Sequence, residues 1–173
     1  MIFWEIVSGM IGGWRDGDRL YGEGVEDFPR TGDRNIAESL SILRSKGINP
    51  LCTAMKYAHD IGLEFHVSLR PEMFQAAPQY EEVFTTDYYR DHPELRLKDS
   101  AGNDVTGLSY AYPELRRRQI DLLREAVDYG AEGAAIIYPR SGPYVLFEEP
   151  FLELFRKELG SDPRELEGSD SRI

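Results

Sequence analysis

Residues 63–70 alternate strictly between apolar side chains and side chains that can carry chemistry. Successive side chains of a β-strand point to opposite faces, so the polar residues of this segment would line one face of a sheet. That face would present a carboxylate, an imidazole, a hydroxyl and a guanidinium group, from Glu64, His66, Ser68 and Arg70. Imidazole and carboxylate groups serve in acid–base catalysis, and arginine donates paired hydrogen bonds. The segment is therefore a candidate binding or reaction surface.

A helix is predicted directly before this strand. Asn49 is placed to cap it, Pro50 stands at its first position, and Gly62 ends it. A helix followed at once by a strand is half of a βαβ unit, which indicates a parallel sheet covered by helices. In an open doubly wound sheet both faces of such a strand would be apolar. One polar face therefore favours a (β/α) barrel, whose active site lies at the C-terminal ends of the strands.

Length, composition and charge limit the possible functions. The chain has 173 residues, of which 41% are hydrophobic and 12% aromatic, so it can bury the core of one domain. It is shorter than the ~250 residues typical of a complete barrel. The formal net charge of -11 argues against nucleic acid as a partner, because phosphate binding requires a basic surface.

Other classes of protein are disfavoured by missing motifs. No apolar run reaches the ~20 residues of a membrane span, and no export signal is visible, so we expect a soluble chain without a membrane partner. The single cysteine cannot form an internal disulfide, and no spaced histidine, cysteine and carboxylate cluster specifies a metal. No nucleotide-binding or nucleophile-elbow motif occurs. We therefore expect neither a cofactor nor a metal.

The remaining pattern predicts further elements around this unit. They are a strand at 2–7, a helix at 35–46, a β-hairpin within 95–110, a helix at 113–128, a buried strand at 134–140 and a helix at 150–159. The connection from 71 to 112 is long, and long loops in compact domains are usually functional. We expect one domain over residues 1–173, with a polar tail at 160–173.

Four segments carry a resemblance to a known family: residues 57–66 (YAHDIGLEFH), 92–94 (HPE), 108–114 (LSYAYPE) and 161–166 (SDPREL). Over nearly its whole length the chain resembles the glycosyl-hydrolase-like (β/α) barrel proteins of bacteria, a family assigned to carbohydrate hydrolysis by kinship with retaining glycosidases. The resemblance implies an incomplete α/β barrel of about three parallel strands with helices outside. It also implies further βα units after Ile173 and at least one before Met1, and carbohydrate as the substrate.

Two adjacent carboxylates, Glu148 and Glu149, follow the predicted strand at 134–140 and are the candidate catalytic residues. Glycoside hydrolysis needs two carboxyl groups ~5–5.5 Å apart for retention of configuration, or ~6.5–9.5 Å apart for inversion. Because sequence neighbours cannot easily share one site, the second carboxylate would come from Glu64, Glu72 or residues outside the chain. The alternative is that both glutamates only stabilise the N-terminus of the helix that follows them.

Five side chains on or after the predicted strands are candidates for binding the sugar: Glu64, His66, Arg70, Tyr138 and Arg140. The two arginines end strands, where a barrel collects its binding residues, although each could form a structural ion pair instead. His66 could contact the substrate or fill the barrel interior. Tyr138 could stack on the ligand or pack in the core.

Two functions remain open at this point. The chain could belong to a glycoside hydrolase, or to a barrel that binds carbohydrate without catalysis. Related barrels supply a carboxylate at the end of the strand that corresponds to 133–140, and this chain has none there, which favours binding alone. The family resemblance, in contrast, favours the enzyme. The strand edges of a partial barrel stay unpaired, so we also expect the 173 residues to self-associate when expressed alone.

Overall fold

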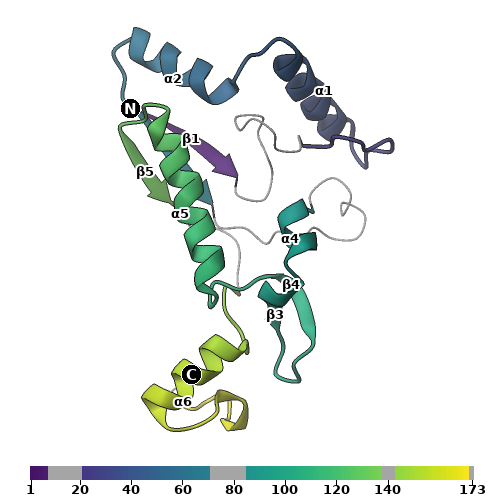
Figure 1. Cartoon of the computed structure of the whole chain (residues 1–173), viewed down its shortest axis with the longest axis vertical. Helices are drawn as coiled ribbons and strands as arrows, with labels where there is room; N and C mark the ends of the chain where they lie inside the picture. Colours follow the sequence, from purple (N-terminus) through teal and green to yellow (C-terminus); the bar gives the residue numbers. More distant parts are fainter. Residues whose placement is uncertain (8–20, 71–84, 138–142, 172–173) are drawn as a thin grey trace.

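The computed structural model describes residues 1–7, 21–70, 85–137 and 143–171 (Figure 1). Its centre is a three-stranded parallel sheet in the order β1-β2-β5. The strands span Ile2–Val7, Phe65–Arg70 and Gly133–Ile136. The order of the strands follows the order of the chain, so each crossover proceeds in the same direction.

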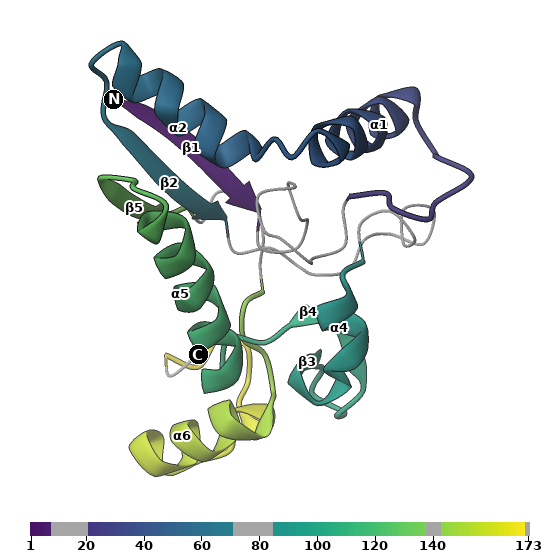
Figure 2. The ribbon, with the colours of Figure 1, turned by 45° about the horizontal axis from the view of Figure 1, so that its top comes forward.

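Helices α2 (Pro50–Asp60) and α5 (Pro113–Asp128) cover the same face of this sheet (Figure 2). The core between them and the strands is apolar, and its buried members include Leu51, Met55, Ala58, Phe65, Val67, Leu69, Leu122 and Ala126. A doubly wound sheet would reverse its strand order and place helices on both faces. The fold is thus mixed α/β, and within the described ranges the helices pack on one face of the parallel sheet. The three strands do not close into a barrel.

The ends of α2 follow the signals in the sequence. The side chain of Asn49 accepts hydrogen bonds from two backbone N–H groups of the first turn, at 3.0 and 3.2 Å. At the other end Gly62 adopts a φ of 73°, and the N–H of Leu63 donates to the carbonyl of Ala58 at 2.9 Å. This is a Schellman motif, in which the N–H of Leu63 is bonded to the last turn of the helix and is not available to the strand. Strand β2 consequently begins at Phe65, two residues later than predicted.

Helix α1 (Thr31–Ser45) also begins at a different residue from the prediction, four residues earlier. Asp33 in its first turn is 3% exposed. The hydroxyl of Tyr21 and the guanidinium of Arg30 each donate to its carboxylate at 2.8 Å. These contacts extend the helix toward its N-terminus, and Arg30 holds the pKa of Asp33 below its usual range. In both ribbon views α1 lies apart from the sheet.

A small antiparallel sheet confirms the predicted hairpin, with β3 at Arg96–Lys98 and β4 at Asp104–Leu108. The short helix α4 (Asp87–Asp91) and a 3-10 turn (Pro93–Leu95) precede it. Its core is separate from that of the parallel sheet and consists of Tyr89, Leu95, Leu108 and Leu115. After α5 and β5 the chain forms helix α6 (Glu149–Leu159) and then a 3-10 turn at Pro163–Glu165. Figure 2 shows the hairpin and α6 beyond the C-terminal ends of the parallel strands.

Strand β5 overlaps the strand predicted at 134–140, but the prediction that this strand is buried is wrong. Ala134 is exposed and Ile136 is 46% exposed, because β5 is an outer strand and pairs only with β2 among the described residues. Residues 138–140 of that prediction lie outside the described ranges. Within these ranges, no helix has the length and apolar character needed to cross a membrane.

Glu132, in the turn that leads into β5, joins three elements at the N-terminal end of the sheet. One carboxylate oxygen accepts the backbone N–H of Phe65 at 2.8 Å. The other lies 2.9 Å from Nε2 of His59 on α2. The hydrogen bond from Phe65, and then the contact with His59, hold the pKa of Glu132 below its usual range.

We expect the chain to lose stability in acid partly through Glu132. Because folding lowers its pKa, its contribution is complete above the ordinary value of about 4.5 and is lost as the pH falls through the folded value. Urea unfolding midpoints between pH 7 and pH 3 should therefore fall less steeply in Glu132→Gln than in wild type. The exposed Glu153→Gln serves as the control and should keep the wild-type slope. Equal slopes for wild type and Glu132→Gln would contradict this assignment.

Candidate functional site

His66 has the most specific surroundings of the predicted site residues that the structure describes. The parallel register places Phe3 of β1 and Gly133 of β5 directly beside it. The rings of Phe3 and His66 are 5.3 Å apart and inclined by 59°. Oε2 of Glu64 lies 3.4 Å from Nε2 of His66. We call Phe3, Glu64, His66 and Gly133 the His66 layer.

The His66 layer lies on the face of the sheet opposite α2 and α5, and a ligand can reach it. Phe3 is 57% exposed, and the side chains of His66 and Glu64 are 21% and 61% exposed. A neighbouring carboxylate can orient an imidazole through a hydrogen bond. The layer thus combines an exposed aromatic ring with two hydrogen-bonding groups, as a site for a ligand with both apolar and polar surfaces requires.

Within β2 the alternation read from the sequence is confirmed, because His66 lies opposite the buried Phe65 and Val67. Leu63 and Glu64 precede the strand, and Leu63 is 37% exposed. Ser68 follows on the same face as His66 but is only 2% exposed, so it is unavailable to a ligand. Arg70 ends β2 as predicted, and its side chain lies outside the described part of the structure. The same holds for the whole of Tyr138 and Arg140.

Sequence reasoning missed two members of this layer, Phe3 and Gly133. The signal for Phe3 was present, since alternation along β1 separates it from the partly buried Ile2 and Trp4. Gly133 stands directly before the strand predicted at 134–140, and its residue type alone does not indicate its neighbour. Its place beside His66 depends on the register between β2 and β5, which one strand pattern cannot supply.

Glu148 is 1% exposed and links the hairpin to α6. Its Oε1 accepts the backbone N–H of Lys98 at 2.8 Å. Its Oε2 accepts the hydroxyl of Ser109 at 2.7 Å and the backbone N–H of Leu146 at 2.9 Å. A buried carboxylate that receives three donors from its own chain is well stabilised there. This geometry gives Glu148 a structural role.

Glu148 and Glu149 both stand at the start of α6, as the interpretation that they stabilise the N-terminus of this helix expects. Glu148 occupies the N-cap position of α6, yet its side chain makes no capping hydrogen bond. Glu149 is the first residue of the helix and its side chain is 64% exposed. Its carboxylate lies 2.9 Å from Arg156, which also contacts Asp162 at 2.9 Å. Of the two glutamates, Glu149 is the one that a ligand can reach.

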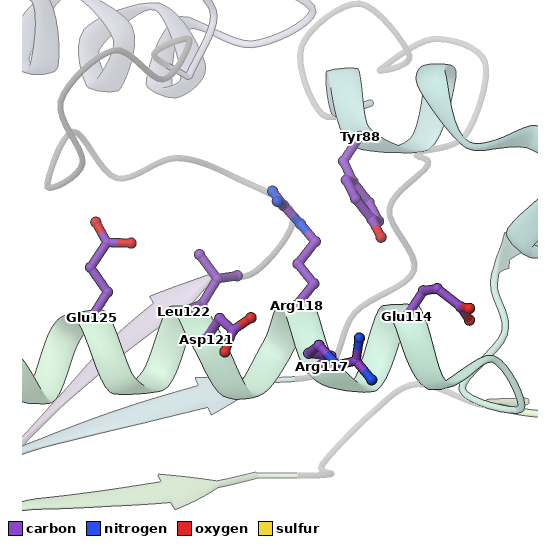
Figure 3. A pocket seen from close by; sticks show the side chains of 7 residues that line it. All are labelled: Tyr88, Glu114, Arg117, Arg118, Asp121, Leu122 and Glu125. Carbon is purple, nitrogen blue, oxygen red and sulfur yellow. The ribbon is translucent and has the colours of Figure 1, made fainter.

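A groove of about 400 Å³ runs between Tyr88 of α4 and helix α5 (Figure 3). Its other lining residues are Glu114, Arg117, Arg118, Asp121, Leu122 and Glu125. The guanidinium of Arg118 lies 4.0 Å from the ring centre of Tyr88, and the ring of His92 lies 4.2 Å from it. Because the Tyr88 ring already contacts both groups, it is poorly placed to stack on a sugar. The groove is therefore a weaker candidate than the His66 layer.

The described residues contain no group of three or more histidine, cysteine, aspartate or glutamate side chains suited to a metal. Comparison of the chain with protein family models, with curated proteins and with solved structures finds no match.

Proposed function

We propose that the chain is part of a glycosidase-like (β/α) barrel and that it binds carbohydrate on the face of β1-β2-β5 opposite α2 and α5. The observation that supports this most strongly is that, in the part of the chain that the structure describes, the helices cover one face of the sheet while Phe3, Glu64 and His66 stay accessible on the other. Both helices pack on one face, and the other carries an accessible aromatic ring beside a histidine and a carboxylate. The family resemblance supplies the ligand class.

The His66 layer suits a sugar ring chemically. A pyranose has an apolar face of C–H groups, which would pack on Phe3, and hydroxyl groups at its rim. Those hydroxyls would donate to the carboxylate of Glu64 and exchange hydrogen bonds with the imidazole of His66. The net charge of -11 disfavours acidic sugars through long-range repulsion. The proposed ligand is therefore a neutral oligosaccharide.

Hydrolysis is the second candidate, and the exposed carboxylate of Glu149 after β5 is the observation that favours it. Binding without catalysis stands first because the adjacent Glu148 is buried in structural hydrogen bonds. A retaining or inverting mechanism needs two carboxyl groups that reach the same glycosidic bond. If the protein binds carbohydrate without catalysis, the role of Glu149 is its ion pair with Arg156.

Calorimetric titration with neutral α- and β-linked hexose oligosaccharides tests the proposal. We expect Phe3→Ala to weaken the binding seen in wild type at least ~10-fold, which corresponds to about 1.4 kcal/mol. Tyr57→Ala is the matched control, because Tyr57 is a 64% exposed aromatic residue on the outside of α2, and it should keep wild-type affinity. Equal losses in both variants, or no binding by wild type, would contradict the proposal.

The same ligands separate binding from hydrolysis. If the protein only binds carbohydrate, incubation leaves the oligosaccharide intact and Glu149→Gln binds it as wild type does. Cleavage by wild type that falls ~100-fold or more in Glu149→Gln, as the loss of an acid or nucleophile predicts, would replace binding by hydrolysis.

A further inference from the structure

Gly133 stands beside His66 in the pairing of β5 with β2. Its φ does not fall in the left-handed region that favours glycine. The backbone at this position would accept any L-residue. Any constraint against a side chain at 133 therefore comes from the space around it.

That space is filled by the imidazole of His66. A Cβ atom built on Gly133 would lie 2.7 Å from Nδ1 and 2.8 Å from Cε1 of the ring, and real Cβ atoms essentially never come closer than 3.0 Å to another heavy atom. The ring of Phe3 lies on the β1 side of the imidazole at 5.3 Å. A methyl group at 133 would push the imidazole toward Phe3 or away from the sheet.

We propose that Gly133 is a positioning residue, whose missing side chain lets the imidazole of His66 rest on β5 where it meets the sugar. The role in recognition rests on the proposed function, whereas the coupling between positions 133 and 66 does not. The ring is held by the bare backbone of Gly133, by Phe3, and by the carboxylate of Glu64 at 3.4 Å from Nε2. An imidazole ordered before binding offers its hydrogen bonds at a lower entropic cost.

The test compares Gly133→Ala with Gly168→Ala, because a Cβ at Gly168 would meet nothing within 4 Å. The chain has three histidines, so the imidazole Hε1 region of its NMR spectrum holds three signals. We expect Gly133→Ala to move the His66 signal while the His92 signal stays, and Gly168→Ala to move neither. Gly133→Ala should also weaken carbohydrate binding about 10-fold, or 1.4 kcal/mol.

A double-mutant cycle with His66→Ala keeps the proposal falsifiable if Gly133→Ala folds poorly. Removal of the imidazole frees the space, so Gly133→Ala should lower the melting temperature by several degrees in wild type and by less than half as much in the His66→Ala background. An equal loss in both backgrounds, or an unmoved His66 signal, would overturn the proposal. If wild type binds no carbohydrate, the proposed function fails, and the cycle and the spectrum still decide the coupling.

Discussion

Replacing Glu148 by glutamine is expected to lower the free energy of unfolding by about 3 kcal/mol. The carboxylate accepts hydrogen bonds on both oxygens, from Lys98 on one side and from Ser109 and Leu146 on the other. A glutamine must turn its NH₂ group toward one of these sides, where it meets an N–H or O–H donor. The group is buried, so water cannot replace the lost acceptor.

Glu149→Gln is the matched control, since it makes the same chemical change one residue away. Its side chain is 64% exposed and forms an ion pair on the surface, so its unfolding free energy should stay within about 0.5 kcal/mol of wild type. Urea denaturation of the three proteins at pH 7 gives both values. Similar stabilities for Glu148→Gln and Glu149→Gln would show that the buried hydrogen bonds of Glu148 contribute little.

The second large effect concerns association. In the described sheet, β1 and β5 each pair on one side only, and Ile136 on β5 is 46% exposed. Unpaired strand edges with apolar side chains pair readily with other chains. We therefore expect the 173-residue chain to elute from a sizing column well ahead of a 19.8 kDa monomer, with a volume that depends on concentration.

A charge at the edge of β5 tests the route of association. Ile136→Lys should shift the chain toward the monomer, because lysine on an edge strand opposes further pairing. Ile42→Lys changes an isoleucine of α1 that is 53% exposed, and it should leave association unchanged. A monodisperse wild-type monomer that melts cooperatively above ~60 °C would contradict the expectation.

Local signals predicted α2, α5 and the alternation of side chains along β2 well. Asn49 caps α2 and Gly62 ends it, and Pro113 begins α5 at the predicted residue. These signals act within one turn of helix, so a single sequence contains them. The alternation around His66 is equally local, since it depends only on the geometry of one strand.

The features that the sequence did not predict all depend on contacts between residues far apart in the chain. Glu148 receives hydrogen bonds from residues 39 and 50 positions away, and no spacing in the sequence indicates such contacts. The role of Gly133 depends on which residue of β2 lies beside it. The exposure of Ile136 depends on what pairs with the outer edge of β5. The sequence thus indicated which residue types could act in a site. The burial and contacts of each residue depend on tertiary packing, which one sequence does not reveal.

Titration of the protein with a neutral oligosaccharide, followed through its three histidine Hε1 signals, tests the proposed binding face most directly. His59 lies on α2, His66 on the opposite face of the sheet, and His92 next to α4. We expect the His66 signal to move with saturable dependence on ligand while those of His59 and His92 stay in place. A His66 signal that stays fixed at millimolar ligand, or movement confined to His59 or His92, would contradict this expectation.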